Sequence, residues 1–314
     1  MKPLVETVDL KKLFKTPSGA LHAVDGVNLQ IMPATTLGVV GESGCGKSTL
    51  GRVVLNLIQA TSGQVFFEGE DITHAGKQRL FELRKRMQII FQDPYASLDP
   101  RMTVRQIISE PLIVYKLAKG KELYDKVSDL MDTVGLARRM ATAYPHELDG
   151  GRRQRIGIAR ALALEPKFIV CDEPVSALDV SIQAQILNLL MDLQEQRGLT
   201  YMFITHNLSV VKHISNEIAV MYLGQCVEKA EKLELFRNPC HPYTKALLGS
   251  ILSTDLSVKL EDQSIISGEV TSPINPAPGC RFAARCTHRT DACTQADIPL
   301  KEVSPGHFVA CTLL

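Results

Sequence analysis

The stretch Gly41-Glu-Ser-Gly-Cys-Gly-Lys-Ser48 decides how the rest of the chain is interpreted. It follows an apolar run at 37–40 and precedes residues 49–58, whose apolar side chains recur at helical spacing. Strand, glycine-rich loop and helix in this order are the setting of a phosphate-binding loop, where backbone N–H groups and a helix N-terminus face an anion. A glycine-rich turn that matches by chance is the alternative, but it does not account for this setting. The stretch therefore predicts a nucleotide site.

Two side chains of this loop have specific predicted roles. Lys47 would reach the β- and γ-phosphates of the nucleotide, and Ser48 would hold Mg²⁺. The loop residues that we expect around the nucleotide are Gly41, Glu42, Ser43, Gly44, Cys45, Gly46, Lys47, Ser48 and Thr49.

The composition is that of an ordinary globular protein. The chain has 314 residues, of which 45% are hydrophobic, and its 35 basic and 34 acidic residues give a formal charge of +1. That balance gives no indication of a nucleic acid partner. Residues 1–9 lack the apolar core of a signal peptide, and no apolar run reaches the ~20 residues that cross a bilayer. We therefore expect a chain that does not itself enter the membrane.

The hydrophobic pattern predicts an α/β fold. Short β-like runs at 4–8, 22–31 and 63–69 indicate an antiparallel layer beside the nucleotide-binding core. Apolar strands are expected at 87–91, 168–173 and 200–205. Helical spacing marks 80–86, 104–117, 121–134, 153–164 and 182–197, the last stopped by Gly198. Strands that alternate with helices predict a largely parallel core.

Two acids stand where the predicted strand 168–173 emerges. Asp172 would bind Mg²⁺ and Glu173 would polarise the water that attacks the γ-phosphate. The alternative is a pair of acids that begins a solvated turn, and the neighbouring motifs argue against it.

Those motifs resemble the ATP-binding subunits of ABC transporters. Gln92 follows a strand, Leu148-Asp-Gly-Gly-Arg152 precedes a helix, Ser176-Ala-Leu-Asp179 follows Glu173, and His206 ends the next strand. The resemblance covers residues 5–237 and implies a P-loop NTPase cassette with an antiparallel β layer and a helical subdomain at about 93–165. It also implies that Gln92 completes the shell of Mg²⁺ and that His206 contacts the γ-phosphate. Phe14 lies where the family places an aromatic ring against adenine, although an ordinary strand aromatic is the alternative.

The signature segment departs from the family pattern Leu-Ser-Gly-Gly-Gln. In the family this segment closes over ATP held by a partner subunit, which assigns Asp149, Gly150 and Gly151 to a composite site. An ionised Asp149 only accepts hydrogen bonds and places like charge beside phosphate, which Arg152 would partly offset. We expect that composite site to be weak or inactive, and the site that uses this chain's own Lys47 and Glu173 to be intact.

Further segments resemble the dipeptide and oligopeptide importer branch, which also contains nickel importers. They are residues 91–100, 172–181, 238–244 and 273–280. The resemblance implies an ATPase at the cytoplasmic face of the membrane, with a second homologous ATPase, two transmembrane permeases and, through them, a solute-binding protein as partners. A nickel or other small-solute importer, a soluble ABC ATPase that acts on nucleic acid or the ribosome, and a non-catalytic regulatory nucleotide binder are the alternatives. The solute itself is not identified by the sequence.

After about residue 237 the composition shifts toward Pro, Ser and Cys, which predicts a separate C-terminal extension over 238–314. Four of the eight cysteines gather there, at Cys280, Cys286, Cys293 and Cys311. Reduced thiols in one core-poor segment favour a metal over disulfides. Their wide spacing and the resemblance to the importer branch favour a [4Fe–4S] cluster, with zinc and unligated thiols as the alternatives.

Overall fold

The computed structural model describes residues 2–249 and 271–314, which form two compact units. Unit 1 comprises Met1–Met32, Thr36–His74 and Phe203–Leu314, and unit 2 comprises Pro33–Thr35 and Ala75–Met202. Residues 250–270 of the predicted extension lie outside the described residues. Among the described helices, none is both long and apolar enough to cross a membrane.

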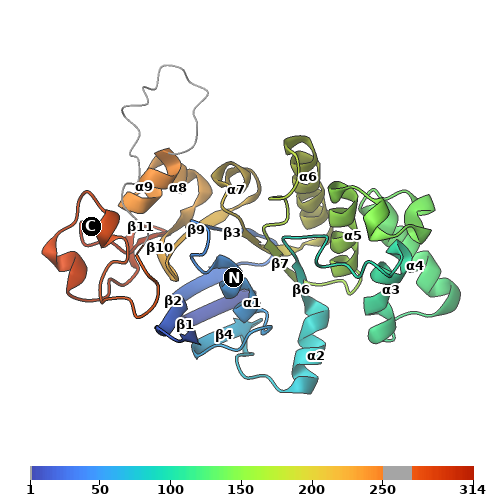
Figure 1. The fold of residues 1–314 in the computed structure, drawn as a ribbon, viewed down its shortest axis with the longest axis horizontal. Helices are drawn as coiled ribbons and strands as arrows, with labels where there is room; N and C mark the ends of the chain where they lie inside the picture. The colour runs from blue at the N-terminus through green and yellow to red at the C-terminus, as the bar shows by residue number, and fades with distance from the viewer. Residues whose placement is uncertain (1, 250–270) are drawn as a thin grey trace, which may run out of the picture. The chain divides into compact units, whose positions relative to one another are not determined.

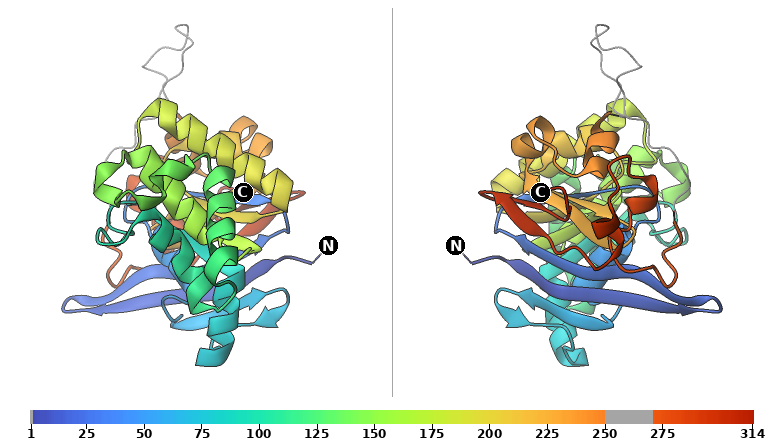
Figure 2. Two further views of the ribbon diagram at one scale, coloured as in Figure 1. Left: turned by 90° about the vertical axis from the view of Figure 1, so that its right-hand side faces the viewer. Right: turned by 90° about the vertical axis from the view of Figure 1, so that its left-hand side faces the viewer.

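Unit 1 contains the antiparallel layer that the sequence predicts. Its strands are β1 (Val5–Thr16), β2 (Gly19–Ile31), β4 (Ser62–Phe67) and β5 (Glu70–Asp71), in the order β2-β1-β4-β5. The predicted short runs at 4–8 and 22–31 belong to two long strands, which pair through most of their length as a hairpin (Figures 1 and 2).

A second sheet of unit 1 carries the phosphate loop. β3 (Thr36–Val40) pairs in parallel with β9 (Glu217–Tyr222), and β9 pairs antiparallel with β10 (Gln225–Glu231). β12 (His307–Val309) then pairs with β10 and with β11 (Lys301–Ser304). The C-terminal strands thus extend the sheet that contains β3, whereas the sequence predicts a separate extension.

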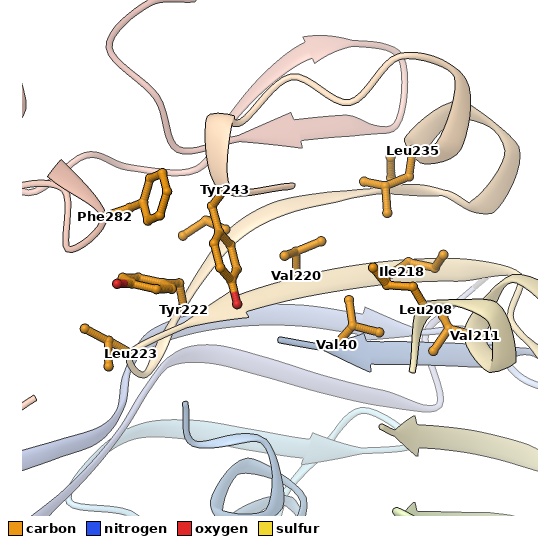
Figure 3. Close-up of a cluster of buried hydrophobic side chains, with 12 residues drawn as sticks. Val40, Leu208, Val211, Ile218, Val220, Tyr222, Leu223, Leu235, Tyr243 and Phe282 are labelled. Carbon is orange, nitrogen blue, oxygen red and sulfur yellow. The ribbon is translucent and has the colours of Figure 1, made fainter. Parts of the chain in front are cut away.

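Unit 1 also contains the helices α1 (Lys47–Val54), α7 (Leu208–Ile214), α8 (Lys232–Arg237) and α9 (Pro242–Gly249). α7 packs on β3 and α8 on β9 and β10, whereas α1 contacts β1 and β2 of the antiparallel layer. Because α7 lies on β3, a Cβ at Gly38 would come 2.4 Å from the Val211 side chain. Figure 3 shows that Val40, Val220, Leu235, Tyr243 and Phe282 share one buried cluster, although they come from β3, β9, α8, α9 and the C-terminal residues.

Unit 2 contains the parallel strands β6 (Met87–Ile90) and β7 (Phe168–Asp172) and most of the predicted helices (Figure 1). The helices are α2 (Lys77–Arg86), α3 (Val104–Val114), α4 (Gly120–Thr133), α5 (Gly150–Leu162) and α6 (Val180–Arg197). β8 (Thr200–Ile204) runs across the limit between the two units. Gly198 ends α6 in the left-handed conformation, as predicted.

Two helices end earlier than the sequence pattern predicts. α1 stops at Val54 instead of reaching 58, and α3 stops at Val114 instead of 117. Asn56 and Lys116 adopt positive φ angles of 52° and 54°, which no continuing right-handed helix permits. The apolar periodicity that continues past both points is misleading, because Leu57 and Leu117 are exposed.

Candidate functional site

The phosphate loop depends on glycines where its backbone passes close to other segments of unit 1. Gly41 and Gly46 have φ angles of 152° and 103°. A Cβ at Gly41 would lie 2.1 Å from the carbonyl oxygen of Met221, and one at Gly46 would lie 1.9 Å from that of Ala23. Side chains at these positions would therefore displace the loop, and glycine permits the curl that turns N–H groups inward.

Lys47 holds the loop from its centre. Its ammonium donates to the carbonyl oxygens of Gly41 and Glu42, each at 2.8 Å, and the side chain is buried. Behind the loop, the Gly224 N–H donates to the Cys45 carbonyl at 2.8 Å. The side chain of Lys47, the first residue of α1, thus reaches back to the start of the loop and holds the loop closed. In this position the N-terminus of α1 can face a phosphate.

Phe14 and His206 are the other predicted site residues in unit 1. Phe14 is half-buried in β1, and the Lys12 ammonium lies 5.0 Å from the centre of its ring. His206 is exposed directly after β8, where the Thr205 N–H donates to the carbonyl of Val39 at 3.1 Å. The hydrogen bond fixes the start of this loop to β3, which leads into the phosphate loop.

In unit 2, strand register brings Gln92 and Glu173 together. Ile90 is paired with Cys171 in the parallel pair β6–β7, so the residues two places further along each strand lie side by side. The Gln92 Nε2 donates to the Glu173 Oε2 at 3.0 Å. The amide thereby orients the carboxylate that the sequence predicts as the general base.

The backbone around Glu173 is also constrained. Its φ of 47° is unusual for a residue with a Cβ, and such conformations cost about 1–3 kcal/mol and gather at functional sites. The Ser176 hydroxyl donates to the Glu173 carbonyl at 3.1 Å, which holds the following turn. Asp172 is buried at the end of β7. A fixed, strained carboxylate beside a buried one suits the catalytic role better than the solvated turn that was the alternative.

Asp149 is turned toward its own helix. Its Oδ1 accepts from the Arg152 N–H at 2.8 Å as the N-cap of α5, and its Oδ2 lies 3.2 Å from the Arg152 guanidinium. A Cβ at Gly150 would come 3.1 Å from Leu178, and one at Gly151 would come 2.7 Å from Ile182. The two glycines therefore allow the start of α5 to approach the segment that leads into α6.

The predicted site residues are divided between the two units. Unit 1 holds Phe14, residues 41–49 and His206, and unit 2 holds Gln92, residues 149–151, Asp172 and Glu173. Within unit 2 the structure joins Gln92 to Glu173. Ser48, Gln92 and Asp172 each carry the kind of oxygen that Mg²⁺ takes as a ligand.

The four C-terminal cysteines line one small cavity. Cys280, Cys286, Cys293 and Cys311 surround about 10 Å³, which is roughly room for one water molecule. Burial raises the pKa of Cys280 to about 11. Among the described residues, no three of these thiols lie within 4.8 Å of one another, whereas tetrahedral zinc needs sulfurs about 3.8 Å apart. The donor set fits a thiolate-bound metal, but a cluster would need the turns around the cavity to spread.

A second group of potential ligands, which was not predicted from the sequence, is formed by Glu228, Cys240 and His307. Their ligand atoms all lie within 4.8 Å of one another. The Glu228 carboxylate accepts from the N–H groups of Cys240 at 2.7 Å and His241 at 2.9 Å, and lies 2.7 Å from the His307 Nε2. Since these donors already satisfy the carboxylate, the group is complete without a metal. Only the run 238–244, quoted above for its resemblance, pointed to this region.

Comparisons with known proteins cover nearly the whole chain. The family profile described as "ABC transporter" matches residues 24–176, and that described as "Oligopeptide/dipeptide transporter, C-terminal region" matches residues 227–293. The oligopeptide transport ATP-binding proteins OppF and AppF of Bacillus subtilis are 51% and 49% identical to it, over 98% and 99% of this chain and 96% and 97% of their own lengths. The dipeptide transport ATP-binding protein DppF of Escherichia coli is 46% identical over 99% of this chain and 94% of its own.

Solved structures confirm the predicted cassette fold. The dimeric ATP-binding cassette MJ0796, solved in a post-hydrolysis state with ADP and Pi, aligns with a TM-score of 0.67 and 28% identity over 73% of this chain and 98% of its own. The cbiO1 protein of Clostridium perfringens, part of the ABC transporter complex cbiONQ, aligns with a TM-score of 0.67 and 26% identity over 76% of this chain and 92% of its own. The chain therefore has the mixed α/β fold of a P-loop cassette.

Proposed function

Because this chain belongs to the oligopeptide and dipeptide branch of ABC transporter ATP-binding proteins, we propose that it hydrolyses ATP to drive peptide import through a membrane transporter. One observation carries the proposal: a single chain combines the ABC cassette with the C-terminal region of peptide transporters. The buried, centrally held Lys47 in a glycine-dependent loop supports the ATP-binding half of the proposal.

We further propose how the site residues divide the work. Lys47 and the loop N–H groups bind the β- and γ-phosphates, and Phe14 stacks on adenine. Glu173, oriented by Gln92, takes a proton from the attacking water, and His206 contacts the γ-phosphate. Ser48, Gln92 and Asp172 would hold Mg²⁺, which neutralises charge on the phosphate oxygens when bound.

The signature segment would serve the nucleotide held by a second homologous ATPase. Asp149 brings a carboxylate to that nucleotide, but its charge is already shared with the Arg152 side chain and the N-terminus of α5. We propose that the composite site completed by Asp149 is the weaker of two. The site with Lys47 and Glu173 would receive a signature segment from the partner.

The remaining partners follow from transporter architecture. Two transmembrane permeases would contact this chain at the cytoplasmic face of the membrane, where it would be peripheral. A solute-binding protein would deliver peptide to the permeases. The relatives named for oligopeptide and dipeptide transport support a peptide as the solute.

The C-terminal thiols would hold a [4Fe–4S] cluster with a structural role. Support comes from the convergence of all four thiols on one cavity. Cys280, Cys286, Cys293 and Cys311 would be its ligands, and the cluster would join the turns that surround the cavity.

The transport proposal is tested with the chain assembled with its ATPase partner and permeases in proteoliposomes. Labelled dipeptide and a nickel chelate are supplied with the solute-binding protein, and uptake is measured with and without ATP. We expect ATP-dependent dipeptide uptake that Glu173→Gln abolishes while ATP still binds. Nickel uptake without dipeptide uptake would show that the solute is nickel and not a peptide. Near-normal ATP turnover by Glu173→Gln would show that Glu173 is not the general base.

A further inference from the structure

A basic side chain of the C-terminal segment contacts the phosphate loop. Arg285, at the end of the short turn η4 (Ala283–Arg285), lies against Glu42, the second residue of the loop. The guanidinium donates through Nη1 to Glu42 Oε2 at 2.9 Å and through Nη2 to Oε1 at 3.2 Å. Paired donors on a carboxylate fix both its position and its plane. A residue 243 positions away in sequence thus orients a loop side chain.

Neighbouring groups hold the same point of the loop. The Glu42 N–H donates to the Tyr243 hydroxyl at 2.9 Å, so the backbone of this residue is also held from the C-terminal side of the chain. Arg285 Nη1 also lies 3.3 Å from the Tyr222 hydroxyl. Tyr222, Tyr243 and Phe282 pack against one another with tilted rings whose centres are 4.6–5.3 Å apart, and Figure 3 shows these three side chains together. Packing of this kind leaves the guanidinium little freedom to turn away.

The burial of the pair indicates a geometric role more than a stabilising one. The Arg285 side chain is 7% exposed and that of Glu42 is 29% exposed. When charges are taken out of water, the desolvation cost offsets much of their attraction, so such pairs contribute little net stability. Their geometry is nevertheless well defined. A loop that must present its N–H groups to phosphate gains affinity when it is already ordered before the ligand arrives.

We propose that Arg285 is a positioning residue for the nucleotide site, which acts through Glu42 to hold the phosphate loop in its binding conformation. The C-terminal segment therefore sets the affinity of the cassette for nucleotide. This inference rests on the proposed role of the loop in binding ATP. It does not depend on whether the four thiols bind a metal.

The test is a double-substitution cycle read as MgADP affinity of the full chain. Arg285→Gln and Glu42→Gln should each weaken binding by about tenfold, within the range typical of coupled sites. The double variant should be no weaker than either single variant, because both substitutions break the same contact. Arg285→Lys keeps the positive charge but loses the paired N–H donors of the guanidinium, so its affinity should lie between those of Arg285→Gln and the unsubstituted chain.

Arg289→Gln is the matched control, since it removes an exposed guanidinium from the same segment and should leave affinity unchanged. Melting curves of each variant separate lost affinity from lost folding. The inference is overturned if Arg285→Gln binds MgADP within twofold of the natural chain, or if the losses from the two single variants multiply. Lys47→Ala distinguishes the two proposals: normal MgADP binding by that variant would refute the loop as the nucleotide site itself.

Discussion

Replacing the buried Glu228 should detach the C-terminal strands from the sheet. Its carboxylate is fully buried and accepts hydrogen bonds from three donors: two N–H groups at the α8–α9 junction and the imidazole of His307 in β12. Glu228→Ala removes the only acceptor that these contacts share. The N–H groups of Cys240 and His241 and the Nε2 of His307 would then lose the acceptor that they share.

The size of the effect follows from those three donors. A buried donor without a partner costs about 1–3 kcal/mol, and removal of one member of a buried pair costs about 3–5 kcal/mol. Water entering the cavity and a turn of His307 toward Glu234, whose Oε1 lies 3.6 Å from Nδ1, would recover part of this. We expect a loss of about 4 kcal/mol in unfolding free energy, or about 10 °C in melting temperature. Glu228→Gln keeps the shape and one acceptor oxygen, so it should cost about half as much.

Hydrogen exchange gives the decisive measurement because it reports on β12 directly. The Ala310 N–H, which donates to the Val227 carbonyl at 2.9 Å, should lose its protection in Glu228→Ala. Glu234→Gln is the control, since that carboxylate is 37% exposed and its change should cost less than about 0.5 kcal/mol. Unchanged protection of Ala310, or equal melting temperatures of Glu228→Ala and Glu234→Gln, would refute the reasoning.

Three further predictions concern other parts of the chain. Asp149→Ser keeps a capping side chain at the start of α5 and removes a carboxylate from the composite site. The ATPase activity of the assembled transporter should therefore rise a few-fold at an unchanged melting temperature. Equal or lower activity would show that Asp149 is tolerated. Burial lowers the pKa of His241 from 6.5 to about 4, so the neutral ring contributes stability that is complete above pH 6.5 and is lost as the pH falls toward 4. The loss in unfolding free energy should be about 2 kcal/mol at pH 5. Denaturant titrations should show that His241→Asn, whose side-chain oxygen can still accept from the Tyr243 N–H, flattens this dependence; an unchanged slope would assign it to other groups. Anaerobic purification should yield brown protein with about four iron atoms per chain, and Cys286→Ser should lose them, whereas stoichiometric zinc or colourless protein would exclude the cluster.

The parts of the fold that local sequence determines could be predicted well. The apolar run before Gly41 and the helix after it follow from spacing, and the strands that end near Gln92 and Glu173 follow from apolar runs of strand length. The contact between Gln92 and Glu173 was not predicted, because it depends on the register of β6 against β7. Register is a property of the pair, and an apolar run alone does not encode it.

Long-range contacts account for the features that the sequence did not reveal. Glu42 meets Arg285 across 243 residues, and Glu228 meets His307 across 79. β12 is short and lies in a stretch rich in polar residues, so its sequence is typical of a loop. It forms a strand because it pairs with β10. The Asp149 side chain could be assigned to a nucleotide from its motif, but its use as the cap of α5 required the backbone.

The pairing of β12 with β10 also has a consequence for how the protein is made. At about 5–20 residues per second, a ribosome needs roughly 4–16 s to synthesise the 79 residues between Glu228 and His307. During that interval β10 has emerged while the strand and the imidazole that complete its surroundings do not yet exist. The nascent chain therefore carries an open strand edge, which favours pairing with foreign strands, and a carboxylate without its histidine. Unit 1 should accordingly finish folding late in translation, and chaperones that shield strand edges should affect its yield more than that of a cassette lacking this pairing.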